Sequence, residues 1–381
     1  NLRLFQLSMI GCVSLLGLLV LPVVVGGWVD ELGFSERDAG LLSSASFLGS
    51  ALAALVLAFR IHRLNLRLVA GIGLLGMAIA DGVSALAGNL PPLAIVAVRF
   101  VSGVASAGVY GAVMGSLAGF RSPDRGYGLF MALQFLVSGA GLYLLPPLMP
   151  QLGVTGVFVL FAAAALVGLA FLSGVPGPAS RAAAPAPATV EWKIILAPAA
   201  MLCLLGYGLF ESSQMGQFAY IERIGVSLGL TPEQLGLSMG FASFIGIPGA
   251  MAVTVLGSRF GYFRPIIVAA SIQIVVMVWL LSATGFGEYF IIACIFSIFW
   301  AFVLPYFQAM CARIDPRGSV VVAGGFATGS AGFLGPAGAA LLVRPDDYRL
   351  MILGVIVTLA MVIVITALLA RQLPLDNDRP L

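Results

Sequence analysis

Long apolar runs follow one another through the whole chain and are separated by short polar segments. A run of about 20 apolar residues makes a helix that spans the hydrocarbon core of a bilayer, and a helix satisfies its own backbone hydrogen bonds in lipid. The pattern therefore predicts an all-α polytopic membrane protein with twelve transmembrane helices. The predicted spans are residues 4–29, 39–59, 68–87, 93–117, 127–149, 154–172, 194–220, 235–256, 265–283, 289–310, 319–343 and 350–370.

Composition and charge agree with this prediction and add an orientation. Of the 381 residues, 60% are hydrophobic and 9% are charged, which excludes a soluble globular protein. Fourteen of the nineteen Lys and Arg residues lie in segments on the N-terminal side of the membrane, four lie on the other side, and Arg99 lies inside a span. Because cytoplasmic segments carry the excess of Lys and Arg, both termini are predicted in the cytoplasm.

The numbers of Lys and Arg also indicate the kind of organism and the kind of binding partner. One Lys stands against eighteen Arg, which indicates a GC-rich bacterial genome and hence a bacterial inner (plasma) membrane. The chain has no basic run, so nucleic acid is not a predicted partner, whereas the lipid bilayer is.

A segment rich in Pro, Gly and Ala divides the chain into halves. Residues 174–192 lack apolar periodicity and are predicted to form a cytoplasmic linker between an N-terminal six-helix bundle, residues 1–173, and a C-terminal one, residues 193–381. The halves resemble each other weakly, since Ala45-Ser46-Phe47-Leu48-Gly49 returns 197 residues later as Ala242-Ser243-Phe244-Ile245-Gly246. Such internal symmetry is typical of repeat-built transporters.

Two ionisable residues lie in neighbouring spans at equal distance from the turn that joins them. Asp81 precedes Leu90 by nine positions and Arg99 follows it by nine, so in a helical hairpin both reach the same depth. A lone charge in a bilayer is costly, by about 3 kcal/mol or more, so the two are predicted to pair or to line one cavity. The alternative is a buried ion pair that only sets helix register.

No motif predicts a metal or a cofactor. The four cysteines are scattered through apolar runs without metal-ligand spacing, so we expect small packed side chains, no disulfide and no metal. His62, the only histidine, falls in a predicted cytoplasmic loop, which excludes an intramembrane histidine relay. The chain has no Walker motif, so ATP-driven transport is not favoured. The cysteines are Cys12, Cys203, Cys294 and Cys311.

Several motifs resemble those of the Major Facilitator Superfamily. Arg99-Phe100-Val101-Ser102-Gly103 is similar to the fourth-helix pattern of that family, an arginine followed four residues later by glycine, which is associated with proton coupling. Residues 256–265 resemble the second-half copy of its loop between helices two and three. The resemblance covers essentially the whole chain. It implies secondary transport by alternating access and a central cavity lined by helices one, four, seven and ten.

The chain also departs from the family patterns. Residues 59–67, the first-half copy of the loop, keep the arginines but lack the usual glycine and aspartate, which weakens the usual account of the cytoplasmic latch. The glycine-proline pattern of the fifth helix of drug antiporters is missing from residues 127–149, so drug/proton exchange is less favoured.

A polar stripe marks the span 93–117. Arg99, Ser102, Ser106 and Tyr110 recur at intervals of three or four residues and therefore share a helix face. With this span at the cavity, as the resemblance implies, all four are candidate substrate-binding residues. Interhelical hydrogen bonding, worth about 1 kcal/mol each at most, is the alternative for the serines.

The span 194–220 carries a carboxylate and two amides deep in an apolar run. Tyr207, Glu211 and Gln214 share a face, Gln217 follows, and three glycines in the same stretch would allow the helix to bend or break. Packing alone explains such residues poorly, so all four are candidate substrate-binding residues. The alternative for Glu211 is a desolvated acid satisfied by its neighbours.

The span 289–310 offers three further candidates for substrate binding. Trp300 is able to stack on a ring or sugar face, although filling core space is the commoner use of tryptophan. Tyr306 and Gln308 follow Pro305, where a kink is predicted.

Together these features favour a secondary active transporter that moves a small organic solute by alternating access. Protons are expected to drive it, with Asp81 or Glu211 as proton site and Arg99 as electrostatic partner or anion anchor. The alternatives are a uniporter or exporter with purely structural charges, and a membrane-embedded enzyme or receptor-like module. An enzyme is not favoured, because no nucleophile, base and orienter set is visible in the spans. We expect a monomer.

Overall fold

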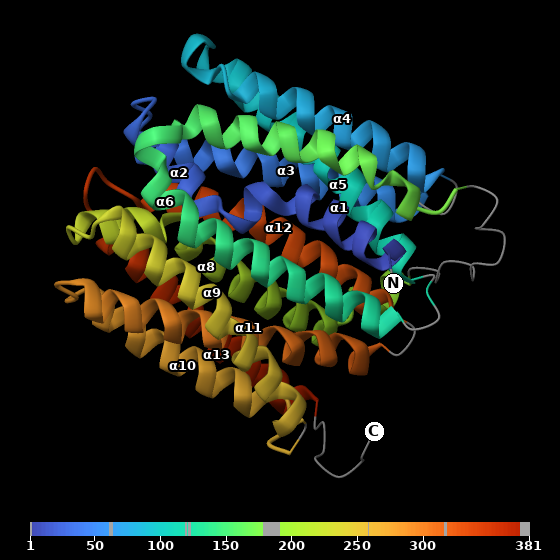
Figure 1. The fold of residues 1–381 in the computed structure, drawn as a ribbon. Coiled ribbons are helices and arrows are strands. Elements are labelled where there is room, and N and C mark those ends of the chain that lie inside the picture. Colours follow the sequence, from blue (N-terminus) through green and yellow to red (C-terminus); the bar gives the residue numbers. More distant parts are fainter. Residues whose placement is uncertain are drawn as a thin grey trace. The chain divides into compact units, whose positions relative to one another are not determined.

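The computed structural model describes residues 2–60, 64–118, 120, 123–177, 191–257, 259–315 and 318–373. Its regular elements are helices (Figure 1). The chain divides into two compact units, residues 1–187 and 188–381. The helices of the first unit are α1 Leu2–Leu19, α2 Leu21–Asp30, α3 Glu36–Arg60, α4 Leu66–Ser84, α5 Pro92–Ala118 and α6 Pro123–Ala170, with short 3-10 turns η2 Ala87–Asn89 and η3 Leu172–Gly174.

The predicted span 4–29 consists of two consecutive helices. Val20 leaves helical geometry (φ −124°, ψ 28°), so the segment consists of α1 and α2. Pro22 lies two residues later and has no N–H to continue the ladder of hydrogen bonds, whereas proline is well tolerated in the first turn of a helix such as α2.

The predicted spans 127–149 and 154–172 both lie within α6, on either side of a kink. Gly153 has φ 62° and ψ 171°, a conformation that glycine adopts without steric cost. Glu31 stabilises this kink, because its carboxylate accepts a hydrogen bond from the Val154 N–H at 2.5 Å. The carboxylate thereby caps the helix that continues from Val154.

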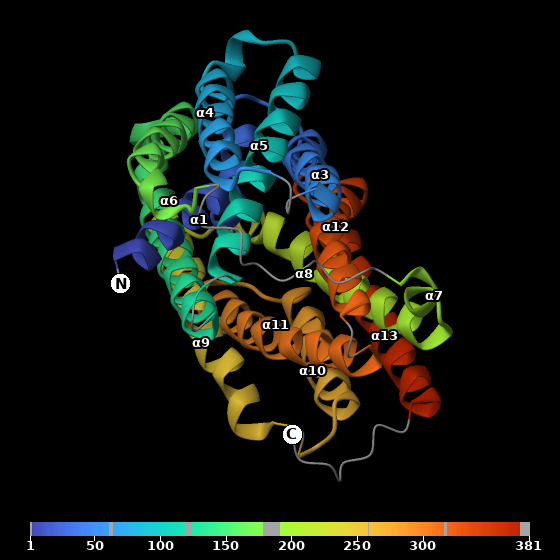
Figure 2. The ribbon, with the colours of Figure 1, turned by 90° about the vertical axis from the view of Figure 1, so that its right-hand side faces the viewer.

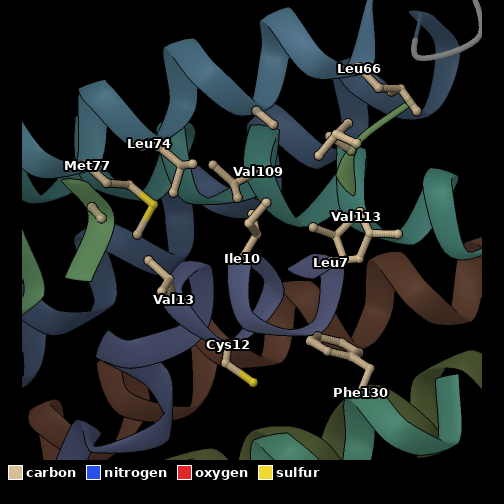
Figure 3. Packing of buried hydrophobic residues seen from close by; sticks show 14 of the residues in the cluster. Leu7, Ile10, Cys12, Val13, Leu66, Leu74, Met77, Val109, Val113 and Phe130 are labelled. Atoms are coloured by element: carbon tan, nitrogen blue, oxygen red, sulfur yellow. The ribbon is translucent and has the colours of Figure 1, made fainter. Parts of the chain in front are cut away.

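In the first unit, α5 packs against α3, α4 and α1, and α6 packs against α1 and α4. Figure 2 shows α4 and α5 running side by side from the turn that joins them. Figure 3 shows part of the core, where Ile10 of α1, Leu74 of α4, Val109 of α5 and Phe130 of α6 pack together. These contacts hold α4 and α5 in a fixed register.

The second unit repeats this pattern of pairing. Here α9 packs against α11 as α3 does against α5, and α10 packs against α11 as α4 does against α5. In addition α8 packs against α12, α13 and α11. The helices are α7 Trp192–Ile195, α8 Pro198–Ser227, α9 Pro232–Leu256, α10 Phe263–Leu280, α11 Phe286–Ile314, α12 Ser319–Leu342 and α13 Arg349–Gln372.

Within the described residues, ten helices are long and apolar enough to cross a membrane. One of them, the segment Gly126–Ala170 of α6, is about 67 Å long at 1.5 Å per residue and is therefore able to cross twice. The more polar α8 is not among the ten, although its 30 residues exceed the length of a span. With α6 divided at Gly153 and α8 included, the helical segments lie where the twelve spans are predicted.

Candidate functional site

The first unit contains a buried ion pair between α4 and α5. Arg99 Nη1 lies 2.6 Å from Asp81 Oδ1, which confirms that the two residues meet. The side chains are almost completely buried, at 2% exposure for Asp81 and 6% for Arg99. Ser102, one turn beyond Arg99, donates a second hydrogen bond to Asp81 Oδ1 at 3.2 Å. The negative charge of Asp81 is therefore matched by a cation and a hydroxyl.

The same arginine also contacts other helices of its unit. Its Nε donates to Ser46 Oγ of α3 at 3.1 Å, and its Nη1 lies 3.4 Å from Ser84 Oγ of α4. The guanidinium covers the ring of Phe158 in α6 at 4.9 Å from the centroid. Arg99 thus joins α3, α4 and α6 to α5, as the register-setting alternative requires.

The rest of the polar stripe on α5 does not join this cluster. Ser106 donates to the Ser14 carbonyl of α1 at 2.7 Å, an interhelical hydrogen bond of the kind considered as its alternative. Tyr110 is 37% exposed, and its ring lies 6.2 Å from that of Phe130 on α6. The spacing on α5 placed these residues near one face, but each has a different neighbour.

The second unit contains a buried carboxylate of a different kind. Glu211 on α8 is 7% exposed and accepts a hydrogen bond from Trp300 Nε1 of α11 at 3.1 Å. No Arg, Lys or His of the described chain forms an ion pair with it. Trp300 lies against two more rings, with Phe218 at 5.6 Å and Phe296 at 6.1 Å between centroids. Glu211 therefore has an aromatic and hydrogen-bonding environment without a compensating charge.

Two amide side chains, one on α8 and one on α10, hydrogen-bond to each other about one turn of α8 beyond Glu211. Gln214 Nε2 donates to Gln273 Oε1 at 3.2 Å, and Gln273 Nε2 donates back to Gln214 Oε1 at 2.9 Å. Gln273 also lies 3.3 Å from the Phe296 carbonyl. The sequence reasoning missed Gln273 on α10, although the signal that selected Glu211, a polar side chain deep in an apolar run, applies to it equally.

Gln217 is the least satisfied of the candidates. It is 1% exposed, and its Oε1 has no hydrogen-bond partner among the described residues. The glycines of α8 do not break the helix, which runs unbroken from Pro198 to Ser227. One of these glycines has another use, since a Cβ on Gly216 would lie 2.9 Å from the Gly335 carbonyl of α12. Glycine there permits close packing of α8 and α12.

The remaining candidates on α8 and α11 separate into two groups. Tyr207 stacks on Phe307 with centroids 5.2 Å apart and rings 10° from parallel, and the side chain of Gln308 hydrogen-bonds to it. Tyr306 instead donates to the Gly257 carbonyl at the end of α9, at 3.2 Å, and is 2% exposed. Tyr306 is therefore not brought to Glu211, while Tyr207 lies one turn from it on the same helix.

Two cysteines that the sequence presents as scattered are in contact. The Sγ atoms of Cys203 on α8 and Cys311 on α11 are 3.8 Å apart, and both thiols are free. Their separation of 108 residues gave no signal in the sequence. No group of three or more His, Cys, Asp or Glu side chains able to hold a metal occurs in the described part of the chain.

Two arginines at the other end of the first unit bind the backbone that follows α6. Arg3 Nε donates to the Gly174 carbonyl and Arg67 Nε donates to the Val175 carbonyl, each at 2.9 Å. Sequence reasoning assigned them only to the basic side of the membrane. Their cationic groups are favourable beside a helix C-terminus. His62 and residues 178–190 of the predicted linker lie outside the described residues.

The chain is similar to known transporters both in sequence pattern and in fold. The family model described as Major Facilitator Superfamily matches residues 7–340. Among solved structures, a single-residue variant of the nucleoside transporter NupG superposes with a TM-score of 0.81 and 13% identity, over 97% of this chain and 99% of that one. NupG itself gives a TM-score of 0.75 and 12% identity, over 97% and 98%.

A bacterial homolog to the human lysosomal transporter Spinster, in an inward-facing and unoccupied conformation, gives a TM-score of 0.75 and 15% identity, over 100% of this chain and 98% of that one. No curated protein matches the chain. At these identities the structural likeness shows the fold alone.

Proposed function

Because this chain belongs to the Major Facilitator Superfamily and is a secondary transporter, not an enzyme, we propose that it moves a small organic solute by alternating access and couples this movement to protons. The proposal depends mainly on one observation, the isolated carboxylate of Glu211. A buried carboxylate without a cation is costly to keep charged, and it becomes neutral by taking up a proton. Such a group is able to load and release a proton as its surroundings open and close.

Asp81 is the second carboxylate in the spans with a proposed role. Its contact with Arg99 at 2.6 Å supplies the counter-charge that Glu211 lacks, so a role for Asp81 in coupling requires a solute or a movement that disturbs this ion pair. Arg99 then acts as the electrostatic partner of Asp81. The anion-anchor role is less favoured, because the Nη1 group already binds Asp81.

Solute contacts are proposed for the polar and aromatic groups around Glu211. Trp300 presents an indole beside the carboxylate, and Tyr207 lies one turn away. An aromatic face stacks on a ring or a sugar, and a carboxylate accepts hydrogen bonds from hydroxyl or amino groups. These groups suit a small solute that carries both a flat apolar face and hydrogen-bond donors.

The test begins by finding a solute. Purified protein is screened for metabolites that raise its melting temperature, since a ligand stabilises the state that binds it. The solute found is then offered to proteoliposomes that contain a pH-sensitive dye. We expect solute entry to move protons with the wild type and not with Glu211→Gln, while exchange of solute across the membrane persists. Glu233→Gln, which alters a surface acid in the first turn of α9, is the matched control.

Undiminished proton movement in both Glu211→Gln and Asp81→Asn would remove proton coupling from the proposal. The alternative is then a uniporter or exporter whose charges are structural. The contacts of Arg99 with three neighbouring helices favour that alternative for the Asp81 pair. Solute exchange that does not depend on a pH gradient would establish it.

We also propose that both termini face the cytoplasm of a bacterial cell, because basic residues are concentrated on that side of the chain. A reporter enzyme that is active only in the periplasm, fused after Leu381, should remain inactive. The same reporter inserted after Asp346, between α12 and α13, should be active.

A further inference from the structure

A pair of cysteines lies outside the polar clusters, at one end of the contact between α8 and α11. Cys203 and Cys311 are each 1% exposed, and their sulfur atoms are 3.8 Å apart. Cys203 is in the second turn of α8, which begins at Pro198, and Cys311 is in the last turn of α11, which ends at Ile314. The pair is therefore close to one end of both helices.

The cysteines belong to a continuous row of contacts that we name the α8–α11 seam. Residues four apart on a helix share a face, and residue numbers fall along α11 as they rise along α8, so the two helices are antiparallel at the seam. The seam begins at the thiol contact and extends to the contact between Glu211 and Trp300. Its pairs are Cys203 with Cys311, Tyr207 with Phe307 and Glu211 with Trp300.

Gly324 of α12 leaves the space beside Cys311 free of a side chain. A Cβ on Gly324 of α12 would lie 3.3 Å from Cys311 Sγ and 3.6 Å from the Tyr207 ring, so the glycine keeps this space open. A disulfide requires sulfur atoms about 2.0 Å apart. The sulfur atoms, which lie 3.8 Å apart, therefore have to approach by about 1.8 Å for the bond to form.

We propose that Cys203 and Cys311 form a reversible disulfide when the thiol pool of the cell is oxidised, and that this bond arrests transport. The two thiols give up two protons and two electrons to a peroxide or a low-molecular-weight disulfide, and one S–S bond forms between them. Under ordinary cytoplasmic conditions thiols stay reduced, so the pair is then a dithiol. The arrest rests on the proposed function, because it requires α8 and α11 to shift along the seam during the transport cycle.

The bond itself is tested without any solute. Purified full-length protein is treated with diamide, which takes up two hydrogen atoms per disulfide formed, and free thiols are then counted by alkylation and mass spectrometry. We expect the four free thiols to fall to two, with a cross-linked peptide that joins Cys203 to Cys311, and to return to four with dithiothreitol. Cys203→Ser should give no such peptide, and the double variant Cys12→Ser/Cys294→Ser should give it in full. Wild-type protein that keeps both thiols, or that links either one to Cys12 or Cys294, overturns the proposal.

The arrest is tested in proteoliposomes with the solute found by thermal shift. We expect diamide to lower solute exchange by at least fivefold in the wild type, reversibly, and to leave Cys203→Ser unaffected. Complete cross-linking with unchanged exchange overturns the arrest. If the untreated protein moves no solute at all, the proposed function has failed, and the thiol count still decides whether the disulfide forms.

Discussion

Asp81 and Arg99 meet at 2.6 Å between α4 and α5, where both side chains are almost completely buried. Each charge is tolerated at this depth because the other is present. The pair therefore couples the folding of the two helices, and removal of one partner should do more damage than removal of both.

Asp81→Asn and Arg99→Met should each destabilise the first unit by about 3–5 kcal/mol, since each leaves one buried charge unpaired. The double variant should lose clearly less than the sum of the two. Thermal unfolding of the four proteins in detergent completes a double-mutant cycle. Ser102→Ala, which removes one hydrogen bond to Asp81, is the control and should cost about 1 kcal/mol or less. A double variant equal to the sum would show that the residues do not interact.

The amide pair Gln214 and Gln273 should behave in the same non-additive way. Gln273→Leu leaves the polar groups of Gln214 buried, with Ser213 as their remaining hydrogen-bond partner among the described residues, so we expect a loss of about 1–3 kcal/mol. Gln214→Leu/Gln273→Leu replaces both partners by apolar groups and should regain most of that loss. The melting temperatures of the single and double variants measure this. A double variant as unstable as its worse parent would contradict the pairing.

Gly335 should tolerate no side chain. A Cβ at this position would lie 2.8 Å from the Gly216 nitrogen of α8, so Gly335→Ala has to separate α8 from α12. Overpacking of this kind costs about 1–3 kcal/mol. Gly338→Ala, three residues further along α12, meets no atom within 4 Å of its new Cβ and is the matched control. Equal melting temperatures for the two alanine variants would show that the helices are not in close contact.

Glu31, which directly follows the last residue of α2, should contribute to stability through its contact with α6. Glu31→Ala removes the acceptor that caps the Val154 N–H at the kink of α6, and caps are worth about 0.5–2 kcal/mol. Glu31→Gln retains a carbonyl oxygen and should recover part of the loss. Protease sensitivity near Gly153, together with the melting temperature, follows both variants. Identical behaviour of the alanine and glutamine variants would argue against capping.

Two features of the helices depend on single residues, one for a local and one for a tertiary reason. The break at Val20 follows from the proline two residues later, and the pattern of apolar residues conceals it because both sides of the break are equally apolar. The three glycines of α8 would allow a break, but none occurs. At Gly216 the missing side chain serves the approach of α12 instead, which depends on a helix more than a hundred residues away.

Sequence spacing also predicted some contacts of the candidate site and not others. Sequence spacing brought Asp81 and Arg99 together, since a short turn joins their helices and sets a common depth, and it placed Ser102 on the helix face of Arg99. It also placed Ser106 and Tyr110 with them, but a helix of 3.6 residues per turn carries successive members of such a stripe slowly around its axis. Ser106 therefore reaches α1 and Tyr110 lies beside α6.

By itself the sequence determined that this is an all-helical membrane protein, because in lipid each long apolar run has to satisfy its backbone hydrogen bonds within itself. It also determined that Asp81 meets Arg99, because equal rise along two adjoining helices matches their depths. Only the tertiary structure decided that Glu211 meets Trp300, Gln214 meets Gln273 and Cys203 meets Cys311. Those contacts depend on which faces of distant helices pack together, and that choice is made by the fit of all side chains in the bundle at once.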